Sequence, residues 1–155
     1  MAIVGTTTWG TTLGIILARE KVPVCLLART SAEAADLNSR RQNHRFLPDI
    51  DFPKSLMVSN DVEEAVSPAE LVIIAVPSDG LRDNIRCIRD SINPGAAILS
   101  ASKGLELPAG KRMSQVLQEE LPSEFHSSIC ALSGPNLAHE IVQGKPSSSV
   151  IAGRD

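Results

Sequence analysis

The first 29 residues contain the feature that most limits the fold: an apolar strand, a glycine turn and an amphipathic helix in immediate succession. Residues 2–4 are apolar and run into the turn at residues 5–10, Gly-Thr-Thr-Thr-Trp-Gly, after which apolar residues recur at helical spacing up to Leu17. A second apolar strand at residues 22–28 closes the unit. Because the first amides of a helix have no partner within it, a turn of this kind can bind the diphosphate of a dinucleotide.

The turn departs from the usual glycine pattern at its middle position. Gly5 and Gly10 occupy the first and third positions of G-x-G-x-x-G, and Thr7 stands at the second. The middle glycine normally lets the backbone approach the diphosphate, so we expect the Thr7 side chain either to displace the phosphate slightly or to hydrogen-bond to it. From the hexapeptide alone, an ordinary strand-to-helix turn is the alternative.

Strand and helix patterns alternate along the rest of the chain. The continuous apolar run at residues 71–76 is typical of a central parallel strand that is covered on both faces. Further strands are expected at residues 56–58, 96–100, 128–132 and 148–152, with helices between them. This order predicts an α/β fold of the Rossmann type, a doubly wound, mostly parallel sheet with helices on both faces, in one domain over residues 1–155.

Local signals predict several helix starts and one irregular segment. Thr30 with Glu33 and Asn60 with Glu63 resemble capping boxes, and Asn136 could cap a helix over residues 137–142. The segment at residues 43–53 has two prolines and no steady period, so we expect a loop that is packed down by apolar side chains. Those side chains are Phe46, Leu47 and Phe52.

Composition narrows the classes of partner. Of the 155 residues 43% are hydrophobic and the formal net charge is −3, so neither nucleic acid nor an acidic membrane surface is an expected partner. No stretch has the length of a membrane span and no signal peptide is expected, so we expect a cytoplasmic protein without membrane insertion. The three cysteines lack metal-ligand spacing and are expected to be small buried residues in a reducing compartment, and no metal site is expected.

Arg29 bears on the choice of cofactor. An NAD-selective site usually has an acidic residue at the end of the second strand, where it bonds the ribose 2′-hydroxyl, and this chain has no acid nearby until Glu33. Arginine can pair with a 2′-phosphate and stack on adenine, so Arg29 favours NADP, or the use of both NADP and NAD. The alternative is a solvated arginine at a strand end.

Two further strand ends carry candidate ligand contacts. Ligands of parallel sheets bind beyond the carboxyl ends of the strands, so Val76 and Pro77 should lie beside the cofactor. Lys103 follows the strand at residues 96–100 and is placed to meet an anionic substrate as a point charge. The alternative for Lys103 is a loop lysine in water.

Five segments together resemble one family, the N-terminal domain of bacterial NAD(P)-dependent glycerol-3-phosphate dehydrogenase. The resemblance runs the length of the chain, and the order of the segments makes it specific. The segments are Gly-Thr-Thr-Thr-Trp-Gly-Thr at 5–11, Asn-His-Arg-Phe-Leu-Pro at 43–48, Ala-Val-Pro-Ser at 75–78, Ser-Lys-Gly-Leu-Glu at 102–106 and Leu-Ser-Gly-Pro-Asn-Leu-Ala-His-Glu at 132–140.

The resemblance implies an oxidoreductase that transfers hydride between NAD(P)H and dihydroxyacetone phosphate, giving sn-glycerol 3-phosphate for phospholipid synthesis. It implies a phosphate-bearing small-molecule substrate and a homodimeric full-length enzyme. It places cofactor contacts at Thr8, Trp9, Arg29, Phe46, Lys103 and Ala138, in addition to Gly5, Thr7, Gly10, Val76 and Pro77 argued above, and substrate contacts at Lys103, Gly134 and Asn136. Thr7 and Asn136 depart from the family's usual residues, glycine and serine or threonine respectively.

The family's general acid/base lysine and its phosphate clamp lie on a C-terminal helical domain, which we expect to be absent from these 155 residues. The isolated chain is therefore expected to bind cofactor with little or no turnover, because hydride transfer also needs a positioned proton donor. A stand-alone dinucleotide-binding or redox-sensing module is the alternative, and a gene that continues in frame past Asp155 would argue against it. Another dehydrogenase, of the hydroxyacyl-CoA or ketopantoate type, would not be expected to carry both the 102–106 and 132–140 segments.

Overall fold

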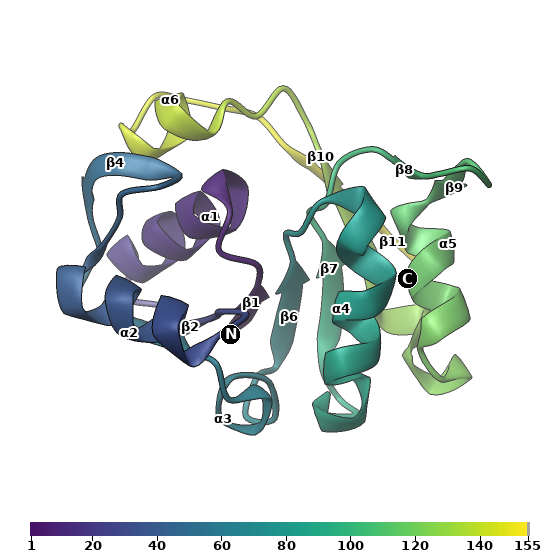
Figure 1. Cartoon of the computed structure of the whole chain (residues 1–155). Coiled ribbons are helices and arrows are strands. Elements are labelled where there is room, and N and C mark those ends of the chain that lie inside the picture. Colours follow the sequence, from purple (N-terminus) through teal and green to yellow (C-terminus); the bar gives the residue numbers. More distant parts are fainter. Residues whose placement is uncertain (155) are drawn as a thin grey trace.

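The order of strands across the main sheet is β11-β10-β7-β6-β1-β2-β5, and helices cover both faces (Figure 1). The computed structural model describes residues 1–154. Its strands are β1 (Ala2–Val4), β2 (Val24–Leu27), β3 (Gln42–Asn43), β4 (Leu47–Asp51), β5 (Leu56–Ser59), β6 (Leu71–Ile74), β7 (Ala97–Ser100), β8 (Leu105–Glu106), β9 (Lys111–Arg112), β10 (Ile129–Ser133) and β11 (Val150–Gly153). Its helices are α1 (Thr8–Arg19), α2 (Ser31–Arg40), α3 (Val62–Val66), α4 (Leu81–Ile88), α5 (Met113–Glu120) and α6 (Ala138–Val142), with the short 3₁₀ helices η1 (Ser78–Gly80), η2 (Arg89–Ser91) and η3 (Ser123–Ser128).

Strand β1 forms the centre of the sheet. Ile3 pairs in parallel register with Leu26 of β2 on one side and with Ile73 of β6 on the other. Six strands are parallel, and β11 runs antiparallel to β10 at one edge. The Rossmann-type, mostly parallel α/β fold predicted from the alternation of patterns is therefore confirmed.

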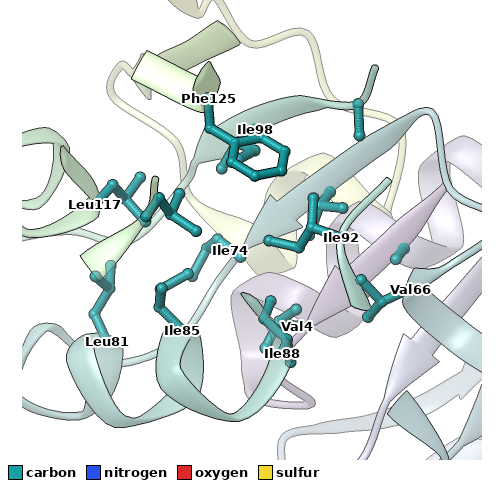
Figure 2. Packing of buried hydrophobic residues seen from close by; sticks show 14 of the residues in the cluster. Val4, Val66, Ile74, Leu81, Ile85, Ile88, Ile92, Ile98, Leu117 and Phe125 are labelled. Atoms are coloured by element: carbon teal, nitrogen blue, oxygen red, sulfur yellow. The ribbon is translucent and has the colours of Figure 1, made fainter. Parts of the chain in front are cut away.

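Successive residues of the central strands supply two separate cores. Val4 and Ile74 point to the face covered by α3, α4 and α5, and Figure 2 shows them packed with side chains of α4 and α5. Ile3 and Ile73 point to the opposite face, toward α1 and α2. This period of two explains why the strands read as continuous apolar runs, since both faces of each strand are buried.

Two helices pack as their sequences predict. Leu81, Ile85 and Ile88 of α4 are all buried, in agreement with the i, i+4, i+7 pattern. In α1, a Cβ added to Gly14 would lie 2.9 Å from the Leu26 side chain. The glycine therefore lets α1 approach β2 closely, which fixes the helix that begins at the glycine turn.

The segment at residues 43–53 is a short hairpin of β3 and β4, so the prediction of an irregular loop was wrong. Leu47 and Phe52 are buried as expected, whereas Phe46 is only partly buried. The anchor is Asn43, whose buried amide donates to the Thr6 carbonyl oxygen at 2.7 Å and to Thr11 Oγ1 at 2.8 Å. Local sequence did not reveal the hairpin because these partners lie more than 30 residues away.

Two predicted caps were also wrong. Asp61, and not Asn60, caps α3, and its carboxylate accepts from the amides of Glu63 and Glu64. Helix α6 starts after Leu137, which has no side chain that can cap it, and the Asn136 amide nitrogen donates to residues 147–149. By contrast, Thr30 caps α2 and accepts from the Glu33 amide, as predicted.

The cysteines differ from the expectation of buried residues. Cys87 is exposed on α4, while Cys25 and Cys130 are partly buried. Burial raises the pKa of the Cys25 thiol, with a further contribution from the nearby Glu64 carboxylate. In the part of the chain that the structure describes, no helix is long and apolar enough to cross a membrane.

Candidate functional site

The glycine turn brings the end of β1, the start of α1 and the end of β6 into direct contact. Gly5 has a φ of +114°, and a Cβ there would lie 2.6 Å from the Ala75 carbonyl oxygen. A Cβ on Gly10 would lie 2.1 Å from the carbonyl oxygen of Gly5. Both distances are too short for any side chain, so these two glycines are required by the backbone path itself.

Thr7, at the middle position of the turn, has its hydroxyl engaged. Thr7 Oγ1 donates to the Ala75 carbonyl oxygen at 3.3 Å, and the Thr7 carbonyl accepts from the Thr11 amide at 2.9 Å. The hydroxyl is therefore directed to the end of β6. The first amides of α1 have no partner within the helix, and the helix dipole favours negative charge beside them.

The turn lies where the strand order reverses. From β1 the chain proceeds to β2 on one side, whereas β6, the other neighbour of β1, is followed by β7 on the opposite side. Loops therefore diverge above β1 and β6 and leave a crevice at the carboxyl ends of the strands. Two cavities lie there.

The first of them, called here the Arg29 cavity, has a volume of about 380 Å³. It lies over the ends of β1 and β2 and extends to the turn before α4. It is lined by Val4, Gly5, Thr6, Thr7, Leu27, Arg29, Glu33, Arg45, Phe46, Val76, Pro77, Asp79, Gly80 and Asn84.

The other, called the Lys103 cavity, has a volume of about 350 Å³ and lies over the ends of β6 and β7. It is lined by Thr7, Thr8, Trp9, Ala75, Val76, Pro77, Ala101, Ser102, Lys103, Asn136 and Ala138. Thr7, Val76 and Pro77 belong to both walls, so the two cavities meet at the glycine turn. An elongated ligand could span both with its middle part at the N-terminus of α1.

Two carboxylates, Glu33 and Asp79, and two arginines line the Arg29 cavity. Glu33 accepts from the Thr6 hydroxyl at 2.6 Å and from the Arg29 backbone amide at 3.0 Å, so both of its oxygens are used. Arg45 lies over the Phe46 ring at 4.9 Å from the centroid. Within residues 1–154, neither the Arg29 nor the Arg45 guanidinium pairs with a carboxylate, and both side chains are exposed. Two cationic groups are therefore available to an anion at this end.

Lys103 holds a defined place in its cavity. Its ammonium group is 3.4 Å from the Asn136 carbonyl oxygen and 5.7 Å from the centroid of the Trp9 ring. The indole Nε1 of Trp9 and Oδ1 of Asn136 are buried without a hydrogen-bond partner in the described chain. Leaving buried polar atoms without hydrogen bonds costs free energy. These two atoms are therefore sites where a bound ligand or a small side-chain movement would supply the missing partners.

The crevice brings together most of the site residues predicted from the sequence. Gly5, Arg29 and Phe46 line the Arg29 cavity, and Thr7, Val76 and Pro77 line both. Thr8, Trp9, Lys103, Asn136 and Ala138 line the Lys103 cavity.

Gly10 and Gly134 line neither cavity in the described chain. Gly10 packs against Gly5, and a Cβ on Gly134 would lie 2.6 Å from the Ser148 carbonyl oxygen, so both glycines act by allowing close backbone contact.

Several residues in or beside the crevice were not predicted as site residues, among them Thr6, Asp79 and Asn84 of the Arg29 cavity. Glu33 was interpreted as a cap and as an acid too far along the chain to select NAD, yet it lines the Arg29 cavity. Arg45 was part of an expected loop, and Asn43 binds the glycine turn from a hairpin that was not predicted. The resembling segment at residues 43–48 contains Asn43 and Arg45, but it did not assign a role to either.

Comparison with known proteins identifies relatives of the whole chain. The family described as NAD-dependent glycerol-3-phosphate dehydrogenase N-terminus matches residues 1–155. A glycerol-3-phosphate dehydrogenase [NAD(P)+] of Dehalococcoides mccartyi is 48% identical over 153 residues, 98% of this chain and 43% of the relative. That of Chlorobium limicola is 43% identical over 97% of this chain and 45% of the relative.

Solved structures agree with these relatives. A glycerol-3-phosphate dehydrogenase from Coxiella burnetii superimposes with a TM-score of 0.90 at 27% identity, over 99% of this chain and 46% of that one. A ketopantoate reductase from Ralstonia eutropha, at 20% identity and a TM-score of 0.65, shares the fold over 86% of this chain and 41% of that one. The chain spans less than half the length of the curated relatives it matches.

Proposed function

The chain belongs to the family of the NAD-dependent glycerol-3-phosphate dehydrogenase N-terminal domain, and from this membership we propose that it seats NAD(P) for the reduction of dihydroxyacetone phosphate to sn-glycerol 3-phosphate. The observation that carries the proposal is the pair of cavities that meet at the glycine turn, between the ends of β1 and β6. Their arrangement suits a ligand with a group at each end and a diphosphate in the middle. We expect the full-length enzyme to be cytoplasmic and homodimeric.

The residues of the turn fit the diphosphate. The close contacts of Gly5 and Gly10 keep side chains away from the N-terminus of α1, where amides and the helix dipole favour an anion. Thr7 is compatible with this role because its hydroxyl already donates to Ala75. Thr8 and Trp9 then contribute backbone amides and one wall of the Lys103 cavity.

The adenosine end belongs in the Arg29 cavity, and its charges favour NADP. Arg29 and Arg45 would flank a 2′-phosphate, and an arginine fork suits a phosphate better than a hydroxyl. Asp79 also lines the cavity, but Glu33 is the carboxylate next to Arg29, and a free carboxylate there would accept from the 2′-hydroxyl of NAD and repel a phosphate. Because both of its oxygens are engaged by Thr6 and by the Arg29 amide, we expect NADP to bind more tightly than NAD.

The nicotinamide end and the substrate belong in the Lys103 cavity. When bound, the nicotinamide supplies the hydride for reduction of the carbonyl. Lys103 would hold the anionic substrate beside it as a point charge, with Asn136 forming the opposite wall. The chain offers this wall and the cofactor seat, and we propose that the proton donor comes from outside these 155 residues, so that the chain alone turns over little.

The experiment is a pair of measurements on the purified chain. NADPH and NADH binding is measured by fluorescence and calorimetry, and dihydroxyacetone phosphate reduction is then assayed. Binding of both cofactors with little turnover is expected. Failure to bind either cofactor would contradict the assignment of the crevice, whereas brisk turnover would contradict only the statement that the chain lacks its proton donor.

A further inference from the structure

The loop that carries Lys103 lies along the end of β6 and the start of α4 through every second residue. Ser102 Oγ accepts from the Val76 amide at 3.1 Å and donates to the Ile74 carbonyl oxygen at 3.2 Å. Gly104 lies so close to the next turn that an added Cβ would be 3.1 Å from Ser78 Oγ. The two hydrogen bonds of Ser102 therefore anchor the loop just before Lys103, whereas Gly104 only lies close to the turn.

Glu106 anchors the other end of the same loop. Its two carboxylate oxygens accept from Arg82 of α4, Oε1 from Nε at 2.7 Å and Oε2 from Nη2 at 2.9 Å. This paired geometry fixes the orientation of the carboxylate as well as its distance. Residues 102, 104 and 106 thus face the segment from β6 to α4, and Lys103, which lies between two of them, faces Asn136 and Trp9 on the other side of the backbone.

Arg82 is itself held by carboxylates of α5. It donates to Glu119 at 2.8 Å and to the buried Glu120, and Arg86 also donates to Glu120. The Arg82 guanidinium lowers the pKa of Glu106 through their hydrogen bonds. The Arg82 side chain is only 22% exposed. The loop end is therefore bonded to an arginine that has little freedom to move.

We infer that Arg82 is a positioning residue, which acts through Glu106 to hold Lys103 at the substrate. The inference rests on the proposed role of Lys103. The pair bonds at two points, which fixes the orientation of the Glu106 carboxylate and with it the end of the loop that carries Lys103. A small displacement of a ligand-contacting group lowers binding and rate strongly, and without Glu106 the loop would be anchored on one side of Lys103 only.

The test compares variants that differ in whether they reach the loop. Arg82→Met and Glu106→Gln break the pair. Arg86→Met and Glu119→Gln change neighbours in the same cluster that do not bond to Glu106, so they serve as controls. Dihydroxyacetone phosphate is titrated by calorimetry into each purified chain saturated with NADP. We expect the first two variants to bind it about tenfold more weakly, with NADPH affinity unchanged within about twofold, and the two controls to bind it normally.

Two further arms separate the inference from the function on which it rests. Arg82→Lys keeps the charge but loses the fork, and we expect it to bind the substrate as weakly as Arg82→Met. Lys103→Met must also weaken substrate binding; if it does not, the role of Lys103 is wrong and the inference falls with it. If Lys103→Met weakens binding while Arg82→Met and Arg86→Met behave alike, only the positioning role is overturned.

Amide hydrogen exchange gives a readout that loss of stability alone would not produce. In Glu106→Gln, exchange is expected to accelerate at Gly104 and Leu105 more than in β6 or α4. An equal acceleration across the sheet would overturn the inference, since it would mean that the pair supports the fold in general and not the loop in particular.

Discussion

The arginines beside the Arg29 cavity and those behind the Lys103 loop are in opposite states. Beside the cavity, Arg29 and Arg45 are exposed and pair with no carboxylate in residues 1–154. Behind the Lys103 loop, Arg82 is bonded to three glutamates, and Arg86 shares one of them. An arginine whose donors are mostly used within the protein can fix a backbone segment, whereas one with free donors can bind an anion from solution. The same residue type therefore has two roles here.

Separation along the sequence does not distinguish these states. Glu33 is four residues from Arg29, yet it binds the backbone amide of Arg29 and leaves the guanidinium free. Glu106 is 24 residues from Arg82, yet the two form a two-point bond. What separates the cases is the packing of α4 against α5 and the β8–β9 hairpin, which brings the glutamates to Arg82 before any ligand binds.

The largest effect is expected at Glu120, where the paired cluster is buried. Replacing Glu120 with Gln removes the charge that accepts from both Arg82 and Arg86 and turns an amide group toward the guanidinium groups. We expect the free energy of unfolding to fall by about 1.5–3 kcal/mol, the value of hydrogen bonds to a charged group. Urea unfolding measures it. Glu119→Gln, at a carboxylate that is 40% exposed, is the control and should cost clearly less; equal losses would mean that burial does not matter in this cluster.

Arg29→Ala tests the unpaired end of the crevice. If Arg29 meets a 2′-phosphate, NADPH affinity should fall by about 1.5–3 kcal/mol, or about 10- to 150-fold, while NADH affinity stays nearly constant. Fluorescence titration of both cofactors gives the two values. Because the Arg29 guanidinium has no carboxylate partner, stability should hardly change, in contrast to Glu120→Gln. An equal loss of NADPH and NADH would show that Arg29 stacks on the adenine and does not read the phosphate.

Lowering the pH should weaken the ion pairs of Glu120 in the unmutated protein. The Arg86 guanidinium, together with Arg82, lowers the pKa of Glu120 to about 2 from its ordinary value near 4.5. A lowered pKa in the folded state means that the carboxylate stabilises the fold above pH 4.5 and that this contribution is lost as the pH falls toward 2. The difference in unfolding free energy between the wild type and Glu120→Gln should therefore shrink between about pH 6 and about pH 3. A constant difference would mean that the charge on Glu120 is not what stabilises the fold.

Much of the fold could be predicted because its signals are local. The apolar runs of β1 and β6, the turn at residues 5–10 and the i, i+4 pattern of α4 each lie within a few residues, and each led to the correct element. The crevice followed from these elements by the rule that ligands bind where the strand order reverses. Most candidate residues, including Thr8 and Lys103, accordingly line its cavities.

The missed features depend on contacts between distant segments. Asn43 anchors its hairpin through Thr6 and Thr11, and Arg82 meets its glutamates only after α5 has packed on α4. The choice of Asp61 over Asn60 as a cap is a shift of a single residue, which patterns of this kind do not resolve. Sequence alone therefore located the site, but it did not show which arginines pair with carboxylates and which do not.

The smallest effect is expected at a third kind of arginine, one that is paired but exposed. Arg40 bonds to Asp36 one turn earlier in α2 at 2.6 Å, and both side chains are 56% exposed. Solvent screens such a pair and side-chain entropy opposes it, so Arg40→Ala should lower the free energy of unfolding by at most about 0.5 kcal/mol, and less still in about 1 M NaCl. Urea unfolding at low and high salt measures this, with NADPH affinity expected to be unchanged. A loss as large as that of Glu120→Gln would mean that pairing alone, without burial, makes an arginine structural in this protein, and the contrast between the two groups of arginines would then have a different cause.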